Sequence, residues 1–268
     1  INAVPAVLSG INLETKYVLK YFGVKEPIFL NDVKIKVKDL NYTKNYSVTE
    51  QDSINDAYRR MNEAGISKIP MVDDHKKLLG IITMKDIAKE QFNENIDLLN
   101  STYENILEAI EGEELLRFDE EITGKLTVAG YRSTTIISSV PLNENSILMV
   151  GDRHSVIEYA IASGVKLLIV TGGHQIKEEH LKLAKEKNVN IIVTPYPTLI
   201  AARRINLANS VSTINYVKDI LCISEYENVS DFMGIANKTR YSYYPVIDEN
   251  EKCKGILRMS DVSYDNRK

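Results

Sequence analysis

The chain has 268 residues and a mass of 30.3 kDa, with 44% hydrophobic and 26% charged residues. This composition is typical of an ordinary folded protein of two or three domains, and it excludes disordered and fibrous proteins. The net charge of −4 and the lack of a dense basic stretch argue against a nucleic-acid partner. No apolar run approaches the roughly 20 residues of a membrane helix, so we expect no membrane partner either.

The first ten residues read as the middle of an apolar element rather than as the start of a domain. We therefore expect the chain to be a piece of a larger protein. Its two cysteines, Cys222 and Cys253, have no metal-like spacing and suit a reducing compartment. A cytoplasmic location is the expectation that follows.

A repeated segment lies near both ends of the chain, at a constant offset of 175 residues. Pro70-Met71-Val72-Asp73 and Gly80 to Asp86 in the first copy match Pro245-Val246-Ile247-Asp248 and Gly255 to Asp261 in the second. Apolar residues at helical spacing precede each copy. Each copy is predicted to contain a helix, a short strand that ends in X-Pro, an Asp-rich turn, a second strand and a helix near the final aspartate.

Two helices of the repeat are expected to begin at Ile54 and Val229, and the two copies are expected to pair with each other. Further upstream, Val37-Lys38-Asp39-Leu40 resembles Val217-Lys218-Asp219-Ile220, with a five-residue difference in spacing. We expect these two segments to be structural equivalents.

The part between the copies shows a different pattern. Residues 91–121 are charged, have helical propensity and are predicted to form a helical linker. From 122 to 210, short apolar runs alternate with helical stretches, which predicts an α/β domain with a parallel sheet. The expected strands are 146–151, 165–171 and 190–194, and the expected helices are 154–163, 177–187 and 198–209.

The repeated segment resembles the cystathionine-β-synthase-type (CBS) domain, and Gly80-Ile81-Ile82-Thr83-Met84-Lys85-Asp86 fits the nucleotide signature of that family. The resemblance implies an α+β pair of CBS domains whose cleft takes an adenosine nucleotide. In that arrangement an aspartate at a helix start accepts hydrogen bonds from the ribose hydroxyls, and the hydroxyl of Thr83 donates to phosphate. Arg258 stands where the family has Ser or Thr and puts a cation beside the phosphate.

The nucleotide-binding residues that the resemblance implies are Lys68, Ile69, Pro70, Ile82, Thr83, Asp86, Lys218, Tyr243, Tyr244, Pro245, Arg258, Ser260 and Asp261. Lys68 and Lys218 are expected to bind phosphates. Tyr243 or Tyr244 is expected to stack on adenine. The alternative for these tyrosines is packing within a half-buried strand.

In the middle domain, Asp152-Arg153 and Thr171-Gly172-Gly173 resemble the signature of the DRTGG domain. Two interpretations remain open. The glycines could bring backbone amides to an anion at a helix start, or the motif could serve the structure or a dimer contact. We favour the structural use, because two glycines are weak evidence for a phosphate loop.

A DRTGG domain between two CBS copies resembles the regulatory insert of family II (DHH-type) manganese-dependent inorganic pyrophosphatases. Residues 1–35 resemble the part of the catalytic DHH domain that leads into it. The implied boundaries are 1–35 for this DHH remnant, 36–90 for CBS 1, 91–121 for the linker, 122–210 for DRTGG and 211–268 for CBS 2.

The metal-binding motifs of the DHH domain are absent from the sequence, and the four histidines show no ligand spacing. We therefore expect neither catalytic residues nor a metal site in this chain. In the larger parent protein, the resemblance implies an inorganic diphosphatase in which Mn²⁺ or Mg²⁺ supplies the attacking hydroxide.

Three functions are compared. In the first, the chain senses AMP, ADP, ATP or a diadenosine polyphosphate as a homodimer and biases the attached DHH catalytic domains. In the second, it is a purely structural dimerisation insert without a ligand. In the third, which rests on weak motifs, the middle domain is an enzyme with Asp152 and His154 as acid and base.

Overall fold

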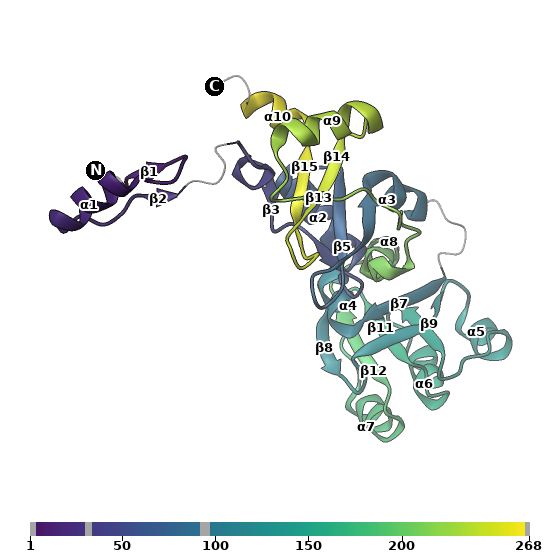
Figure 1. The fold of residues 1–268 in the computed structure, drawn as a ribbon. Coiled ribbons are helices and arrows are strands. Elements are labelled where there is room, and N and C mark those ends of the chain that lie inside the picture. Colours follow the sequence, from purple (N-terminus) through teal and green to yellow (C-terminus); the bar gives the residue numbers. More distant parts are fainter. Residues whose placement is uncertain (1–3, 30–33, 92–96, 266–268) are drawn as a thin grey trace.

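The computed structural model describes residues 4–29, 34–91 and 97–265, and their strands form four sheets. Figure 1 shows an N-terminal arm, a body that combines the early and late parts of the chain, and a larger sheet at the opposite end. Within these described ranges, no helix has the length and apolar character to cross a membrane. The α/β fold class is confirmed.

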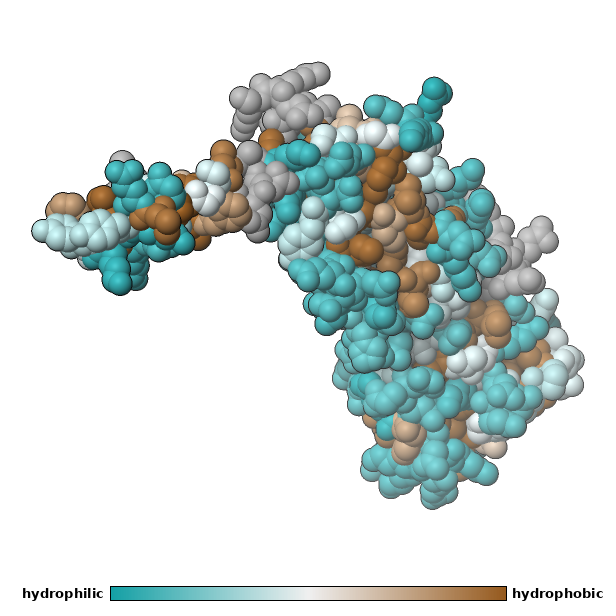
Figure 2. All heavy atoms as spheres, in the orientation of Figure 1, coloured by the Kyte–Doolittle hydropathy of each residue, from teal (hydrophilic) through white to brown (hydrophobic). Residues whose placement is uncertain are grey.

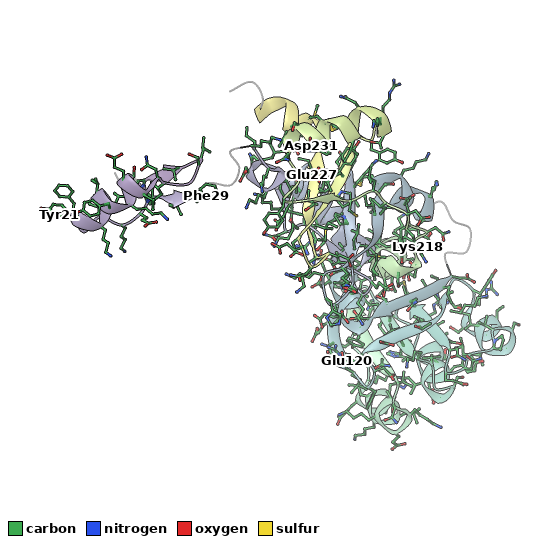
Figure 3. The ribbon with its side chains drawn as sticks, in the orientation of Figure 1. Tyr21, Phe29, Glu120, Lys218, Glu227 and Asp231 are labelled. Carbon is green, nitrogen blue, oxygen red and sulfur yellow. The ribbon has the colours of Figure 1, made fainter. Side chains whose placement is uncertain are left out.

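The arm holds β1 (Ala6–Val7), α1 (Leu13–Tyr21) and β2 (Ile28–Phe29), with β1 and β2 paired in parallel. Asn12 caps α1 by accepting a hydrogen bond from the backbone N–H of Thr15 at 2.7 Å. None of the α1 residues is buried. Apolar side chains therefore lie open on the arm (Figure 2), and Figure 3 places Tyr21 at its tip.

The first copy contains β4 (Val48–Thr49), α2 (Ile54–Ala64), β5 (Lys68–Val72), β6 (Leu78–Thr83) and α3 (Met84–Gln91). Helix α2 begins at Ile54, as predicted, because Ser53 and Asp56 form a capping box. It ends at Gly65, whose φ of 61° lies in the left-handed region that favours glycine. The apolar face of α2 packs on the sheet β4-β5-β6.

Asp56 is the buried acid of this capping box, and its carboxylate accepts hydrogen bonds from the Ser53 hydroxyl at 2.8 Å and from Arg59 at 2.7 Å. Burial raises the pKa of Asp56, but the bonds from Arg59 and Ser53 and the charge of Arg59 outweigh it. The pKa therefore lies below the ordinary 3.8. Such a depressed pKa stabilises the fold above the ordinary pKa, and this stabilisation is lost as the pH falls through the folded-state pKa.

Asp56→Asn is therefore expected to lower the free energy of unfolding by about 1 kcal/mol near neutral pH. Urea unfolding of both proteins measures this difference. The difference should shrink as the pH falls below the ordinary pKa of 3.8. An equal difference at neutral and acidic pH would show that the charge of Asp56 is not its cause.

The second copy repeats this order with β13 (Ile223–Ser224), α9 (Val229–Thr239), β14 (Tyr243–Ile247), β15 (Cys253–Arg258) and α10 (Met259–Asp265). The pairing is equivalent in both copies, because Pro70 lies opposite Ile81 and Pro245 lies opposite Ile256. The predicted internal repeat is confirmed. The predicted pairing of the copies is confirmed as well, since the two hairpin tips meet in a bridge between Lys77 and Lys252.

The segments that lead into the two copies are exchanged between them. The segment with η1 (Val37–Asp39) and β3 (Thr43–Lys44) joins the second copy, where β3 pairs with β15. The segment with η3 (Val211–Thr213) joins the first copy, where Val217 bridges to Ile81. Each copy therefore completes its core with residues that precede the other copy.

This exchange corrects the predicted match between the two leading segments. Both begin with a single 3-10 turn, at Val37–Asp39 and at Val211–Thr213, so residues 37–40 correspond to 211–214 and not to 217–220. The strands that follow agree with this correspondence, because Thr43 pairs with Ile256 and Val217 bridges to Ile81. The short match at 217–220 was a chance similarity between two lysine- and aspartate-containing segments.

The middle domain is a six-stranded sheet of order β7-β9-β10-β11-β12-β8. Strands β9 (Glu121–Val128), β10 (Ser146–Val150), β11 (Leu167–Thr171) and β12 (Asn190–Thr194) are parallel, which confirms the predicted parallel sheet at its centre. The helices are α4 (Tyr103–Ile110), α5 (Ser133–Ser139), α6 (His154–Ala162), α7 (Glu178–Lys187) and α8 (Thr198–Ile205), and η2 (Asn206–Ala208) follows α8. The three predicted strands and three predicted helices are confirmed.

The predicted helical linker at 91–121 is wrong for the residues that the structure describes. Besides α4, this stretch forms β7 (Leu98–Thr102) and β8 (Glu113–Leu116), which pair antiparallel at the two edges of the six-stranded sheet. In β7, buried Leu99 and Ser101 alternate with less buried residues, as in a half-buried edge strand. Part of the charge misled the prediction, because Glu113 and Glu114 are exposed on the edge strand β8 and do not belong to a helix. Residues 92–96 of the predicted linker lie outside the described residues.

Candidate functional site

A row of polar side chains lines the contact between the two copies. Lys68 on β5 lies directly opposite Thr83 on β6, and Tyr243 on β14 lies directly opposite Arg258 on β15. Directly opposed residues of antiparallel strands share a face of the sheet. The amino group of Lys68 lies 5.1 Å from the centre of the Tyr243 ring. We call Thr83, Lys68, Tyr243 and Arg258 the interface row.

The two copies are also bonded directly at this row. The hydroxyls of Ser67 and Tyr243 lie 3.1 Å apart. Arg258 Nη1 donates to the backbone oxygen of Gly65 at 3.0 Å. The fold therefore brings together four of the predicted site residues, and it does so across the boundary between the copies.

Asp86 lies in the first turn of α3, at one end of the interface row. Its Oδ2 accepts hydrogen bonds from the backbone N–H of Thr83 at 3.0 Å and from the Thr83 hydroxyl at 2.6 Å. Within the described residues, Oδ1 of Asp86 has no hydrogen-bond partner. The hydroxyl of Thr83 donates its hydrogen bond to Asp86. In this structure it is therefore not directed at a phosphate.

A pocket of about 250 Å³ opens beside this carboxylate, lined by Asp86, Lys89, Glu90, Ile214 and Asn215. Two of the lining residues come from the leading segment of the second copy, which crosses over to the first. Sequence reasoning missed Ile214 and Asn215. The signal was present, because Asn41-Tyr42-Thr43-Lys44 recurs as Asn215-Tyr216-Val217-Lys218.

Asp261 is the equivalent residue of the second copy, and its surroundings differ. Its oxygens accept from the backbone N–H of Arg258 at 3.1 Å and from Arg258 Nε at 3.1 and 3.2 Å. A further contact joins Arg258 Nη2 to Oδ1 of Asp261 at 3.1 Å. Ser260, also predicted, is exposed in the first turn of α10.

Lys218 does not line the pocket at Asp86. Its amino group lies 5.4 Å from the centre of the Tyr216 ring, just as Lys44 lies 4.9 Å from that of Tyr42 in the other leading segment. Lys218 lines a second pocket of about 250 Å³ near the hairpin tips, together with Lys77 and Glu251. Lys68 therefore lies at the interface row, whereas Lys218 lies at a separate pocket.

Tyr244 requires a correction. Its side chain is fully buried in the core of the second copy, where its ring meets that of Phe232 edge to face at 5.1 Å. Its hydroxyl lies 2.6 Å from that of Thr239 and accepts from the backbone N–H of Tyr241. Its ring therefore offers no face to a base, because core packing occupies it. Four other predicted residues are buried as well and shape the sheets from within: Ile69, Pro70, Ile82 and Pro245.

The motif residues of the middle domain form hydrogen bonds to backbone oxygens in and near its loops. Arg153 donates to the backbone oxygens of Ala129 and Tyr131. The amides of Gly172 and Gly173 donate to the backbone oxygens of Tyr196 and Thr194 at 2.8 and 2.9 Å. These amides are therefore not available to cradle a phosphate, and the structural interpretation is favoured.

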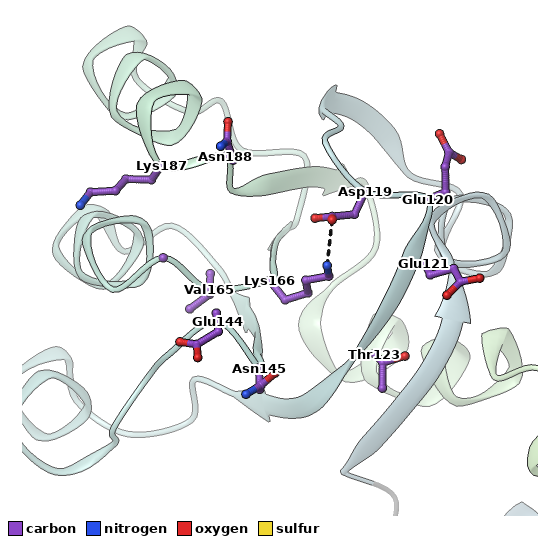
Figure 4. Close-up of a pocket in the computed structure, with 11 residues that line it drawn as sticks. Asp119, Glu120, Glu121, Thr123, Glu144, Asn145, Val165, Lys166, Lys187 and Asn188 are labelled. Atoms are coloured by element: carbon purple, nitrogen blue, oxygen red, sulfur yellow. Dashed lines mark ion pairs between the residues drawn. The ribbon is translucent and has the colours of Figure 1, made fainter.

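A pocket of about 630 Å³ lies in the middle domain and is shown in Figure 4. It lies at the amino ends of the parallel strands, whereas the DRTGG residues follow their carboxyl ends. Lys166 inside it is paired with Asp119 at 2.9 Å. The motif residues therefore do not line this pocket.

Metal-binding and thiol chemistry receive no support from the described part of the chain. No group of three or more His, Cys, Asp or Glu side chains there is arranged to hold a metal ion. Burial raises the pKa of Cys222, and burial also raises the pKa of Cys253, to about 11. Both thiols are protonated at neutral pH and are poor nucleophiles.

Comparison with known proteins identifies the domains. The family model of the CBS domain matches residues 37–93 and 211–264, and that of the DRTGG domain matches residues 105–208. One solved structure shows the CBS and DRTGG domains of the regulatory region of Clostridium perfringens pyrophosphatase, complexed with its activator diadenosine tetraphosphate. It is 30% identical, with a TM-score of 0.72, over 84% of this chain and 100% of that chain. The chain belongs to the same CBS–DRTGG family as this regulatory region.

Two curated relatives extend the similarity of this CBS–DRTGG chain. The cobalt-dependent inorganic pyrophosphatase of Clostridium perfringens is 33% identical, and the match covers 99% of this chain and 49% of the relative. The probable manganese-dependent inorganic pyrophosphatase of Thermotoga maritima is 24% identical, with the same coverage of 99% and 49%. The chain thus spans about half the length of the curated relatives it matches.

Proposed function

We propose that this chain is the regulatory region of a cytoplasmic inorganic pyrophosphatase and binds an adenine nucleotide between its CBS copies. The observation that carries the proposal is the carboxylate of Asp86. It lies within the CBS nucleotide signature, keeps one oxygen free of hydrogen bonds within the described residues, and faces a pocket. A carboxylate oxygen that accepts from ribose hydroxyls is the chemistry this arrangement offers.

We propose that the interface row, which begins at Thr83 beside Asp86, forms a path for phosphates. Lys68 and Arg258 provide positive charge, and Tyr243 lies between them with a half-buried ring. We propose that the ribose lies at Asp86 and that the phosphates of AMP, ADP, ATP or a diadenosine polyphosphate extend along this row. Charge-assisted hydrogen bonds to phosphate are about twice as strong as neutral ones. Phosphates are therefore expected to lie toward Lys68 and Arg258.

The larger protein enters the proposal through the relatives. We propose that residues 1–35 belong to a catalytic DHH domain, that the chain acts as a homodimer, and that Mn²⁺ or a similar ion is held by the catalytic domain outside this chain. Support comes from the match to two pyrophosphatases over 99% of this chain, and from the arm, whose helix α1 buries none of its residues. A bound nucleotide would act by its different affinities for two arrangements of the attached domains.

Isothermal titration of Asp86→Ala with AMP and with diadenosine tetraphosphate tests the proposed function. The unaltered chain is expected to bind at micromolar concentration, about −8 kcal/mol. Loss of the ribose acceptor is expected to weaken binding at least about tenfold, because hydrogen bonds to a charged group contribute about 1.5–3 kcal/mol each.

Asp231→Ala is the matched control, because Asp231 occupies the first turn of α9 and is exposed there (Figure 3). Its affinity for both ligands should equal that of the unaltered chain. If the unaltered chain binds no adenine nucleotide, the sensing function is refuted and the dimerisation insert takes its place.

A further inference from the structure

One short segment carries the chain from the middle domain to the pocket beside Asp86. We call residues 209–215 the connecting segment; it follows η2 and contains η3. Its last two residues, Ile214 and Asn215, line the pocket. Its first residue, Asn209, is buried where the middle domain meets the first copy. A shift of this segment would therefore move one wall of the pocket.

On the middle-domain side, the connecting segment completes the edge strand β7. The N–H of Asn100 on β7 donates to Oδ1 of Asn209 at 2.8 Å. The backbone oxygen of Asn100 accepts from the N–H of Ser210 at 2.9 Å. An edge strand presents a row of unpaired N–H and C=O groups on its outer side. Because the two bonds satisfy both groups of Asn100, β7 and the connecting segment hold each other in place.

On its other side, the connecting segment is bonded to the start of α2 in the first copy. The backbone oxygen of Asn209 accepts from the N–H of Ile54 at 2.9 Å. The first N–H groups of a helix have no partner within the helix, so Asn209 supplies one that α2 lacks. The N–H of Val211 donates to the backbone oxygen of Asp52 at 2.9 Å, and the N–H of Ile214 donates to that of Val211 at 3.0 Å. Hydrogen bonds therefore run without a break from β7 to the wall of the pocket.

We propose that Asn209 is a positioning residue that couples the nucleotide pocket to strand β7 of the middle domain. This inference rests on the proposed function and goes beyond it, because it gives the middle domain a part in nucleotide binding. A nucleotide that packs against Ile214 and Asn215 favours the arrangement in which the connecting segment is fully bonded. Coupling is reciprocal, so the contact with β7 raises nucleotide affinity by the same factor by which a bound nucleotide favours the contact.

Titration of the full 268-residue chain with AMP tests this coupling. Asn209→Ala removes the acceptor of the Asn100 N–H and is expected to weaken AMP binding about tenfold, which is within the usual range for coupled sites. Asn209→Asp keeps an oxygen at the same place, near a helix start that favours negative charge, so it should bind AMP more tightly than Asn209→Ala. Circular dichroism before each titration shows that the variants are folded.

Asn143→Ala is the matched control, because it makes the same change in the same domain. Oδ1 of Asn143 accepts from the backbone N–H of Asn145 at 2.9 Å, in the loop that leads into β10. This bond resembles the one between Asn100 and Asn209, but it does not involve the connecting segment. The AMP affinity of this variant should equal that of the unaltered chain.

Hydrogen exchange provides a second test, which does not depend on a folded variant. In the unaltered chain, AMP is expected to slow the exchange of the Asn100 and Ser210 amides more than that of the amides of β8, at the other edge of the same sheet. In Asn209→Ala this extra protection should disappear. Equal slowing at both edges would reflect only the general stabilisation that a ligand gives to a folded protein, and it would overturn the inference.

An unchanged AMP affinity in folded Asn209→Ala also overturns the inference and leaves the proposed function intact. An equal loss of affinity in Asn143→Ala does the same, because the effect would then not depend on the contact with β7. Absence of AMP binding by the unaltered chain refutes the proposed function itself.

Discussion

Replacing Gly255 by alanine is expected to lower the free energy of unfolding by about 3–5 kcal/mol. Gly255 adopts a φ of 146°, which side-chain-bearing residues rarely occupy. A Cβ atom there would lie 2.1 Å from the backbone oxygen of Thr43 and 2.9 Å from the Cα atom of Lys44. Because both neighbours are backbone atoms of the exchanged strand β3, the clash can be relieved only by moving that strand off β15.

Urea unfolding followed by far-ultraviolet circular dichroism measures this loss, since the chain has no tryptophan for fluorescence. Gly234→Ala is the control. Gly234 lies inside α9 with nothing within 4 Å of a Cβ atom, so the same change there is expected to raise stability by up to about 1 kcal/mol. A loss below about 1 kcal/mol in Gly255→Ala would show that the exchanged strand does not depend on this close approach.

Tyr244→Ala is expected to cost about 3–5 kcal/mol of folding free energy, whereas Tyr243→Ala should cost about 1–2 kcal/mol. The reason is burial. Tyr244 is fully buried against Phe232 and bonded to Thr239, while Tyr243 is only partly buried beside Lys68. Under the proposed function, Tyr243→Ala should also weaken AMP binding about tenfold, in line with loss of a base or phosphate contact.

Thermal and urea unfolding provide the stabilities, and titration with AMP provides the affinities. Tyr244→Phe serves as the control for the second copy, because it keeps the ring and removes only the hydroxyl that meets Thr239. It should lose about 1 kcal/mol and leave affinity unchanged. Weak AMP binding in folded Tyr244→Phe, with normal binding in Tyr243→Ala, would show that Tyr244 makes the contact with AMP and that our assignment to Tyr243 is wrong.

Local sequence signals predicted most of the secondary structure of this protein. The amphipathic spacing from Ile54 predicted α2 from a single stretch of chain. The apolar runs at 146–150 and 190–194 similarly predicted buried parallel strands. Errors arose where charge and exposure were read as helix, as in β8, whose glutamates lie on the open edge of a sheet.

The candidate site was predicted only in part. The signature around Asp86 was evident in the sequence, because its residues are close neighbours in the chain. Thr83 and Asp86, which are hydrogen-bonded, are only three positions apart at the start of one helix. The contribution of Ile214 and Asn215 to the pocket beside Asp86 was not evident in the sequence, because these residues lie more than 120 positions further along the chain. Likewise, nothing in the order of residues distinguished partly buried Tyr243 from fully buried Tyr244.

The sequence by itself determined that this protein contains a CBS repeat around a parallel α/β domain, because periodicity, caps and signatures act over a few neighbouring residues. Only the tertiary structure decided that the leading segments are exchanged and that Arg258 reaches Gly65 across the copies. Those contacts join residues far apart in the chain, and the two exchanged segments approach the sheets closely at Gly80 and Gly255, where a side chain would clash. The free energy of these contacts depends on the packed arrangement of distant segments. No local sequence pattern therefore predicts them.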